Sequence, residues 1–158
     1  MKPIKGRGSA VNPKNRFTEK EVQYDIDEET GQLNRPKTRL IPDHTTQIIS
    51  RNNSPDIGFD VSVNPYRGCE HGCAYCYARP SHEFLGMSAG LDFESKIVVK
   101  YSAPKLLRKE LSNPSWKPQV LVMSGVTDPY QPIEKDLEIT RGCVQVLSES
   151  LHPLVIIT

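Results

Sequence analysis

The feature that most constrains the fold is an alternation of short apolar runs and amphipathic segments that begins at Gly58. The apolar runs are typical of β-strands, and they occupy residues 59–63, 97–101, 119–124 and 154–158. The third run is nearly continuous, as expected for a strand that is covered on both faces. Strands that alternate with helices predict βα units in a parallel sheet.

Two amphipathic segments between these runs are predicted to be helices. The first has Ser102 as a candidate N-cap and Pro104 in its first turn, and it ends before Asn113-Pro114. The second is a helix of about five turns that Pro153 stops. Its apolar stripe consists of Ile133, Leu137, Val144, Leu147 and Leu151.

The last apolar run, L-V-I-I-T, is predicted to be a buried strand. A buried strand with no helix after it leaves one face of a sheet uncovered and one edge open. We therefore expect the sequence to be the first part of a longer protein. The alternative is that another chain covers this strand.

Residues 1–57 differ from the rest of the chain. They contain five prolines, many charges and no long periodic apolar run, which predicts an extended, partly disordered arm before a core that spans residues 58–158. The first 18 residues hold no acid and five basic residues: Lys2, Lys5, Arg7, Lys14 and Arg16. Such an arm is either solvated chain or a contact for a phosphate-rich partner such as nucleic acid.

Charge and composition limit the partners and the cellular location that can be expected for the protein. The formal net charge is +1, so charge gives no global argument for a nucleic-acid or membrane partner. No run approaches the roughly 20 apolar residues of a membrane span, and the N-terminus lacks the apolar core of a secretory signal. These features predict a cytoplasmic protein, in which clustered cysteines bind metal more often than they form disulfides.

Three of the four cysteines lie within eight positions. Cys69, Cys73 and Cys76 have the spacing C-x-x-x-C-x-x-C. Three thiolates on one short loop can bind three corners of a cubane iron–sulfur cluster and leave the fourth iron open to a small molecule. Gly68 and Gly72 would let the backbone curl tightly around such a core. The spacing favours a three-cysteine cluster.

Zinc is the first alternative for the same loop, and thiols without a ligand are the second. His71 or His82 could complete a Cys3His site, although His71 lies inside the loop and gives a spacing that is unusual for a zinc finger. The chain would then be a small zinc-binding module for nucleic-acid interaction. Cys143 lies among apolar residues of a predicted helix and is expected to be a buried hydrophobe.

The loop also resembles a family signature. C-E-H-G-C-A-Y-C is similar to the motif of the radical S-adenosylmethionine superfamily. Longer blocks resemble the branch related to spore photoproduct lyase, often labelled "DNA repair photolyase-like"; they are S-P-D-I-G-F-D-V-S-V-N-P-Y-R-G, G-L-D-F-E-S-K-I and T-D-P-Y-Q-P-I-E. This resemblance runs over essentially all 158 residues.

The resemblance implies an enzyme of lyase-like type with the first half of a partial (βα)6 TIM-type barrel, a [4Fe–4S] cluster and S-adenosylmethionine. Cys69, Cys73 and Cys76 would each ligate one iron, and S-adenosylmethionine would chelate the open iron. One electron, supplied by a reductant such as flavodoxin or ferredoxin, would cleave a carbon–sulfur bond and give a 5′-deoxyadenosyl radical that abstracts a substrate hydrogen. The truncated chain alone is expected to be inactive.

The resemblance assigns roles to further residues. Tyr75 matches an aromatic position that packs near the adenine, or it shields the cluster. Thr127 and Asp128 follow the third predicted strand, where functional groups gather in βα barrels, and they either bind the cofactor's amino group or form a turn. Spore photoproduct lyase has a hydrogen-donating cysteine near this strand end, whereas this chain has Gly125. The substrate therefore stays unassigned, with nucleic acid as one candidate.

Three basic residues near the predicted strand ends have open roles. Arg67 and Arg79 flank the cysteines, and each is either a substrate-phosphate contact or part of a structural ion pair. Lys100, at the end of the second predicted strand, faces either a carboxylate or solvent.

Overall fold

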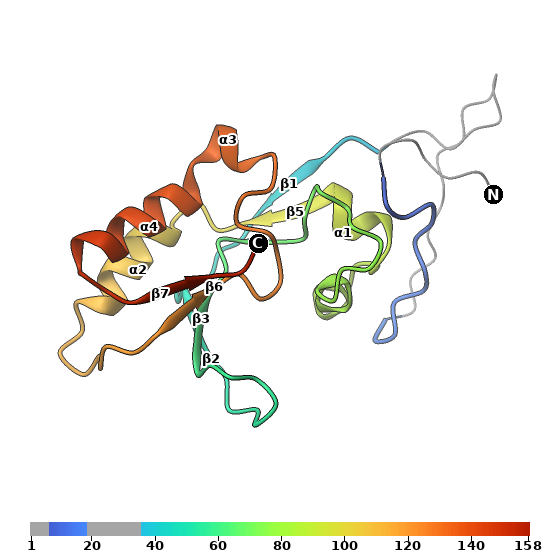
Figure 1. The fold of residues 1–158 in the computed structure, drawn as a ribbon. Coiled ribbons are helices and arrows are strands. Elements are labelled where there is room, and N and C mark those ends of the chain that lie inside the picture. The colour runs from blue at the N-terminus through green and yellow to red at the C-terminus, as the bar shows by residue number, and fades with distance from the viewer. Residues whose placement is uncertain (1–6, 19–35) are drawn as a thin grey trace, which may run out of the picture.

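The computed structural model describes residues 7–18 and 36–158 of the chain, and its strands form two small sheets (Figure 1). The first sheet has the order β1–β5–β4, and its strands are β1 (Arg39–Pro42), β5 (Lys96–Val99) and β4 (Tyr66–Arg67). Strand β1 runs parallel to β5, whereas β4 runs antiparallel to it. This sheet is therefore mixed.

The second sheet has four strands in the order β2–β3–β6–β7. They are β2 (Ile49–Arg51), β3 (Val61–Val63), β6 (Leu121–Met123) and β7 (Leu154–Ile156). The pairs β3–β6 and β6–β7 are parallel, and β2 is antiparallel to β3. The second sheet is also mixed.

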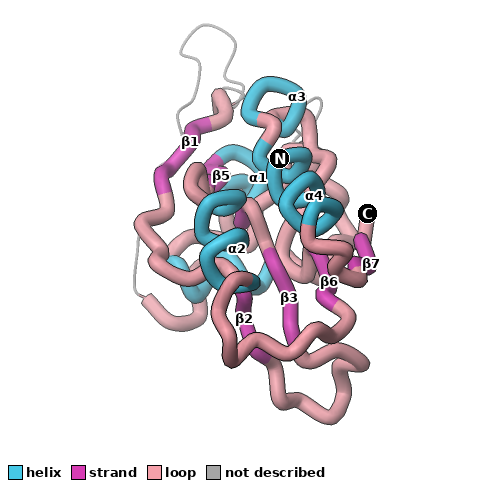
Figure 2. Tube along the Cα trace, turned by 90° about the vertical axis from the view of Figure 1, so that its left-hand side faces the viewer, coloured by secondary structure: helices cyan, strands magenta, loops and turns pink. Residues whose placement is uncertain are grey.

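The described helices fall into two groups on opposite sides of the sheets (Figure 1). One group follows the cysteines and consists of a 3-10 helix, η1 (Arg79–Leu85), and α1 (Leu91–Ser95). The other consists of α2 (Ala103–Leu111), α3 (Glu134–Leu137) and α4 (Ile139–Glu149). Helices α2 and α4 lie side by side over the second sheet (Figure 2).

The main core lies between these two helices and the strands. The side chains of Leu107, Cys143 and Leu147 pack with those of Leu121 and Met123, and each is at most 1% exposed. Cys143 is therefore the buried hydrophobe that the sequence predicts. Burial raises the pKa of its thiol to about 12, so the group stays neutral within the core.

The predicted fold class, half of a parallel TIM-type barrel, is wrong. The four strands expected from the apolar runs form, but β5 does not join the parallel set β3–β6–β7. Its two edges are taken by β4 and by β1, a strand from the region assigned to the arm. Short segments with few apolar residues thus supply strand pairing that periodicity did not predict.

The last predicted strand forms, but it is not buried. The residues of β7 are intermediate or exposed, and Val155 is 47% exposed. Within the described residues no helix is long and apolar enough to cross a membrane.

The predicted five-turn helix is broken in two at Glu138. This residue has a positive φ of 51°, which ends α3 and precedes α4. The side chain of Glu134 then accepts hydrogen bonds from the backbone N–H groups of Thr140 and Arg141, both at 3.0 Å, at the start of α4. It also accepts one from the buried hydroxyl of Tyr66. One carboxylate therefore joins β4 to the first turn of α4.

The region assigned to the arm is partly described. Residues 36–57 contribute β1 and β2, and residues 7–18 lie beside α1 (Figure 1). Lys2 and Lys5, which the sequence analysis placed in a basic arm, lie outside the described residues.

Replacing Glu134 tests its linking role. Glu134→Ala leaves the Tyr66 hydroxyl without its acceptor and uncaps α4, so we expect the free energy of unfolding to fall by about 2–4 kcal/mol in urea titrations. Asp136→Ala is the matched control, because this acid is exposed on the neighbouring turn. Equal stability of the two variants would contradict the assignment.

Candidate functional site

The cysteine loop, residues 68–78, connects β4 to η1. Its backbone turns are closed by hydrogen bonds from Gly72 N–H to the Cys69 carbonyl (3.3 Å) and from Cys76 N–H to the Cys73 carbonyl (3.2 Å). Cys69 N–H also donates to the carbonyl of Phe93 at 2.9 Å, which ties the loop to α1. These hydrogen bonds fix the path of the loop and its position against α1.

Two glycines allow this path, as the sequence predicts. Gly68 and Gly72 have φ values of +85° and +63°, a region that side-chain-bearing residues rarely adopt. A Cβ on Gly68 would also lie 2.9 Å from the Phe93 carbonyl oxygen.

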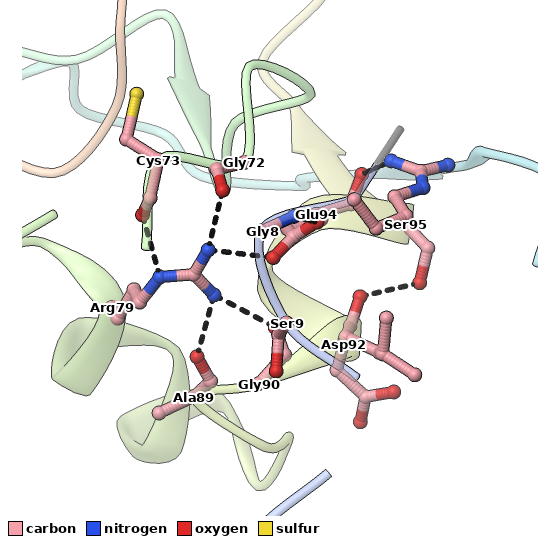
Figure 3. A network of polar contacts seen from close by, with 12 residues as sticks. Gly8, Ser9, Gly72, Cys73, Arg79, Ala89, Gly90, Asp92, Glu94 and Ser95 are labelled. Atoms are coloured by element: carbon pink, nitrogen blue, oxygen red, sulfur yellow. Dashed lines mark hydrogen bonds and ion pairs between the residues drawn. The ribbon is translucent and has the colours of Figure 1, made fainter. Parts of the chain in front are cut away.

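The Arg79 guanidinium holds the loop from below (Figure 3). It donates to four backbone carbonyls at 2.9–3.1 Å, those of Gly72, Cys73, Ala89 and Gly90. It also forms an ion pair with Glu94 at 2.6 Å, with the two side chains only 10% and 0% exposed. Of the two roles left open for Arg79, the structure shows the structural ion pair.

The N-terminal segment packs on the same ion pair. Gly8 N–H donates to the second Glu94 carboxylate oxygen at 3.0 Å, and the Arg7 guanidinium donates to the Glu94 carbonyl at 2.7 Å. A Cβ on Gly8 would lie 1.6 Å from the carbonyl oxygen of Gly72. Only glycine permits the segment to approach the loop this closely.

Further contacts fix the described part of the arm to the helices that follow the loop. Asn12 exchanges two hydrogen bonds with Asp92, at 2.8 and 3.0 Å. The Arg16 guanidinium pairs with the buried carboxylate of Glu83, and this pairing lowers the pKa of Glu83. Arg7 and Arg16 are thus engaged with the protein itself.

The segment after β6, residues 124–131, covers the other side of the loop. The Thr127 hydroxyl donates to the Gly68 carbonyl at 2.7 Å and accepts from the Gln131 amide at 3.0 Å. The side-chain amide oxygen of Gln131 accepts a hydrogen bond from Glu70 N–H at 3.1 Å. Asn64, at the end of β3, fixes this segment by accepting from the N–H of Gly125 at 2.7 Å.

The three thiols of the loop differ in environment. Cys69 is 6% exposed, and burial raises the pKa of its thiol to about 11, against the opposing effect of the backbone N–H groups of His71 and Asp128. Cys73 and Cys76 are half-buried. Figure 3 shows the Cys73 thiol on the side of the loop away from Arg79. Among the described residues, no three His, Cys, Asp or Glu side chains lie close enough together to hold a metal ion.

The two histidines considered as zinc ligands lie in different surroundings. His71 is exposed, with its ring nitrogen 3.9 Å from the Asp128 carboxylate. His82 is fully buried, with its ring 5.6 Å from that of Phe93, and its nitrogens have no hydrogen-bond partner within the described part of the chain. Burial lowers the pKa of His82 to about 4.

The structure brings two of the three predicted cofactor-binding residues to the loop. Thr127 is buried against Gly68, and Asp128 accepts hydrogen bonds from Tyr130 N–H at 2.8 Å and from the Thr158 hydroxyl at 3.1 Å. Tyr75 projects into solvent and is 90% exposed. Their contacts with a cofactor stay predictions.

Several supporting residues escaped the sequence analysis. Asn64, Gln131 and Glu94 have no place in a metal-ligand pattern, and their partners lie far away along the chain. Gly8 carried one signal, because it lies between Arg7 and Ser9 in the basic N-terminal stretch. Glycine in such a position is consistent with a close backbone approach.

Several proteins of other organisms resemble this chain in sequence. Uncharacterized proteins of Mycobacterium tuberculosis and Mycobacterium bovis are each 42% identical to it over 106 residues, which cover 67% of this chain and 31% of the relative. An uncharacterized protein of Methanocaldococcus jannaschii is 36% identical over 88 residues, 56% of this chain and 31% of the relative. The chain thus spans about a third of the length of these relatives. No family model matches, and no solved structure matches significantly.

Gly8→Ala tests the packing of the N-terminal segment. The added methyl group collides with the backbone of the loop, so we expect residues 7–16 to detach and the amides of Gly8 and Gly72 to exchange hydrogen faster. Gly58→Ala is the control, because a Cβ there meets nothing within 4 Å. Unchanged exchange in Gly8→Ala would contradict the contact.

The buried His82 predicts a pH dependence of stability. Its pKa falls from 6.5 to about 4 on folding, so the unfolded state binds more protons between these values. Stability should therefore decline as pH falls from about 6.5 to 4, by roughly 3 kcal/mol in total from this group. Urea titrations of metal-free His82→Leu should show a shallower decline than those of the wild type, whereas the exposed-site variant His44→Gln should match the wild type. The same slope in all three proteins would refute the prediction.

Proposed function

We propose that the cysteine loop binds a [4Fe–4S] cluster through Cys69, Cys73 and Cys76, and that the chain forms part of a radical S-adenosylmethionine enzyme. The observation that carries the proposal is the construction of the cysteine loop. Three thiols come from one short segment, and its backbone is held on one side by Arg79 and on the other by Thr127.

The donor set fits such a cluster. Thiolates are the usual ligands of iron–sulfur clusters, and three of them leave one iron open. Because the three thiols do not converge in this structure, binding requires side chains to turn. Cys73 and Cys76 are only half-buried and can rotate while the backbone of the loop stays in place.

Arg79 positions the loop without adding net charge. Its guanidinium is neutralised by Glu94 at 2.6 Å, so its role is to satisfy the carbonyls of Gly72 and Cys73 on the inner side of the loop. None of these contacts of Arg79 involves a thiol of the loop. Because the backbone of the loop is already held in one conformation, less conformational entropy is lost when the loop binds its ligand.

When bound, the cluster would supply one electron for cleavage of S-adenosylmethionine. Asp128 lies beside the buried thiol of Cys69, and its carboxylate would accept hydrogen bonds from the amino group of the cofactor. The Thr127 hydroxyl keeps one acceptor lone pair beyond its two bonds. The exposed ring of Tyr75 would contact the adenine. A flavodoxin or ferredoxin would deliver the electron.

The substrate of this enzyme is not assigned. The residues that follow β6 are Ser124 and Gly125, neither of which carries a thiol. We therefore do not propose thymine-dimer cleavage by a cysteine at this strand end.

Anaerobic reconstitution of the full chain with iron and sulfide tests the proposal. We expect a brown protein with broad visible absorbance, bound iron and acid-labile sulfide. Cys69→Ala, Cys73→Ala and Cys76→Ala should each lose most of the iron, because each removes one ligand. Cys143→Ala is the matched control and should keep it, since Cys143 lies in the main core.

His71→Ala separates the cluster from the zinc alternative. The proposed cluster does not use the imidazole, so this variant should bind as much iron as the wild type. A colourless wild-type protein that binds one zinc ion and loses it in His71→Ala would overturn the proposal and establish the zinc-binding module.

A further inference from the structure

A second candidate site lies in a cavity of about 560 Å³ between β2, the end of β5 and the segment that follows α2. This volume lies within the range of small-molecule sites, roughly 300–1,000 Å³. Three cations line the cavity: Arg51, Arg67 and Lys100. None of them has a role in the proposed cluster site.

Lys100 is the most informative residue of this cavity. It is 4% exposed, and the described residues provide its ammonium group with no hydrogen bond or ion pair. Its side chain is therefore covered along most of its length, and its ammonium group borders the cavity. Burial and the neighbouring Arg67 guanidinium lower the pKa of Lys100. The expectation of a solvated Lys100 is therefore wrong, whereas the carboxylates of Asp43 and Glu110 lie near enough to act on its pKa in the opposite sense.

The two arginines add positive charge that the described residues also leave without ion pairs. Arg67 is half-buried on β4, where its neighbour Tyr66 points into the main core. Arg51 places its guanidinium 5.7 Å from the centre of the Trp116 ring, which also lines the cavity. The Trp116 ring is fixed in turn by a hydrogen bond of 3.1 Å to His152.

Glu110 is the one carboxylate among the lining residues, and it is engaged with the backbone. Its two oxygens accept from the N–H groups of Ile48 at 2.6 Å and Ile49 at 3.3 Å. The lining thus carries three cations against one carboxylate. The lining has a surplus of positive charge, and an anion in the cavity would offset it.

We propose that this cavity binds the phosphate group of a small phosphate monoester. A dianion matches the surplus of two positive charges, and guanidinium groups suit phosphate oxygens in geometry. Lys100 and Arg67 contact the phosphate, and the flat face of Trp116 contacts the organic part. The site is independent of the cluster, although Arg67 precedes Cys69 by two residues.

Isothermal titration calorimetry on the full chain, at low and constant ionic strength, tests the proposal with two probes. Phenyl phosphate and inorganic phosphate should both bind the wild type, and phenyl phosphate should bind more tightly because of Trp116. Phenol, which lacks the phosphate, should not bind measurably.

Lys100→Met identifies the site. It keeps a long apolar side chain and removes one contact to the anion, so phosphate affinity should fall at least about tenfold. Its stability in urea should stay close to that of the wild type, because the described residues show no hydrogen bond or ion pair of the Lys100 side chain that would be lost. Lys105→Met, on an exposed face of α2, changes the net charge equally and should bind phosphate as the wild type does.

The result that would overturn the proposal is a wild type that binds neither phosphate probe, or equal affinity in Lys100→Met and the wild type. An equal loss in Lys105→Met would do the same, because binding would then follow net charge alone. If Lys100→Met does not fold, Arg51→Gln at the rim of the cavity replaces it and should also lose affinity.

An oligothymidylate with a free 5′-hydroxyl distinguishes a small phosphate monoester from a nucleic-acid backbone as the ligand. All of its phosphates are diesters. Weaker binding than that of phenyl phosphate supports the monoester. Tighter binding that depends on Lys100 would overturn the monoester and assign the cavity to a nucleic-acid backbone.

Discussion

The buried ion pair between Arg79 and Glu94 is the interaction on which the candidate site depends. Its members come from η1 and α1, and they connect the cysteine loop, α1 and the N-terminal segment at one point. Removing one partner of a buried pair leaves the other charge uncompensated and costs about 3–5 kcal/mol. Here the loss would also free the carbonyls of Gly72 and Cys73, so the path of the loop would change with it.

Two parts of the chain that lie far apart in sequence thus enclose the cysteines. The N-terminal segment covers one side through Gly8, and the segment after β6 covers the other through Thr127 and Gln131. Hydrogen bonds from Arg79 and Thr127 hold the backbone of the loop in this arrangement. What a metal would add is the convergence of three thiols, of which two are half-buried and able to turn. The polar support and the ligands are therefore separate sets of residues.

The sequence predicted the local elements well and their pairing poorly. The apolar runs gave β3, β5, β6 and β7 at their positions, and the capping and proline signals gave α2. The parallel barrel was wrong because β1 and β4 are short, carry little periodicity and take the two edges of β5. The positive φ of Gly68 and Gly72 was predictable from glycine alone, whereas Glu94 was not, because its contact with Gly8 spans 86 residues. The burial of Lys100 was not predicted, since burial of a lysine has no local signature in the sequence.

X-ray absorption spectroscopy of the full chain, purified without oxygen and without added metal, tests the central claim most directly. The account predicts an iron edge with a sulfur shell and a short iron–iron distance, as in a cubane cluster bound by thiolates. It also predicts that this signal changes when S-adenosylmethionine is added, because one iron lacks a protein ligand. A zinc edge with a mixed sulfur and nitrogen shell, and no iron, would contradict the account.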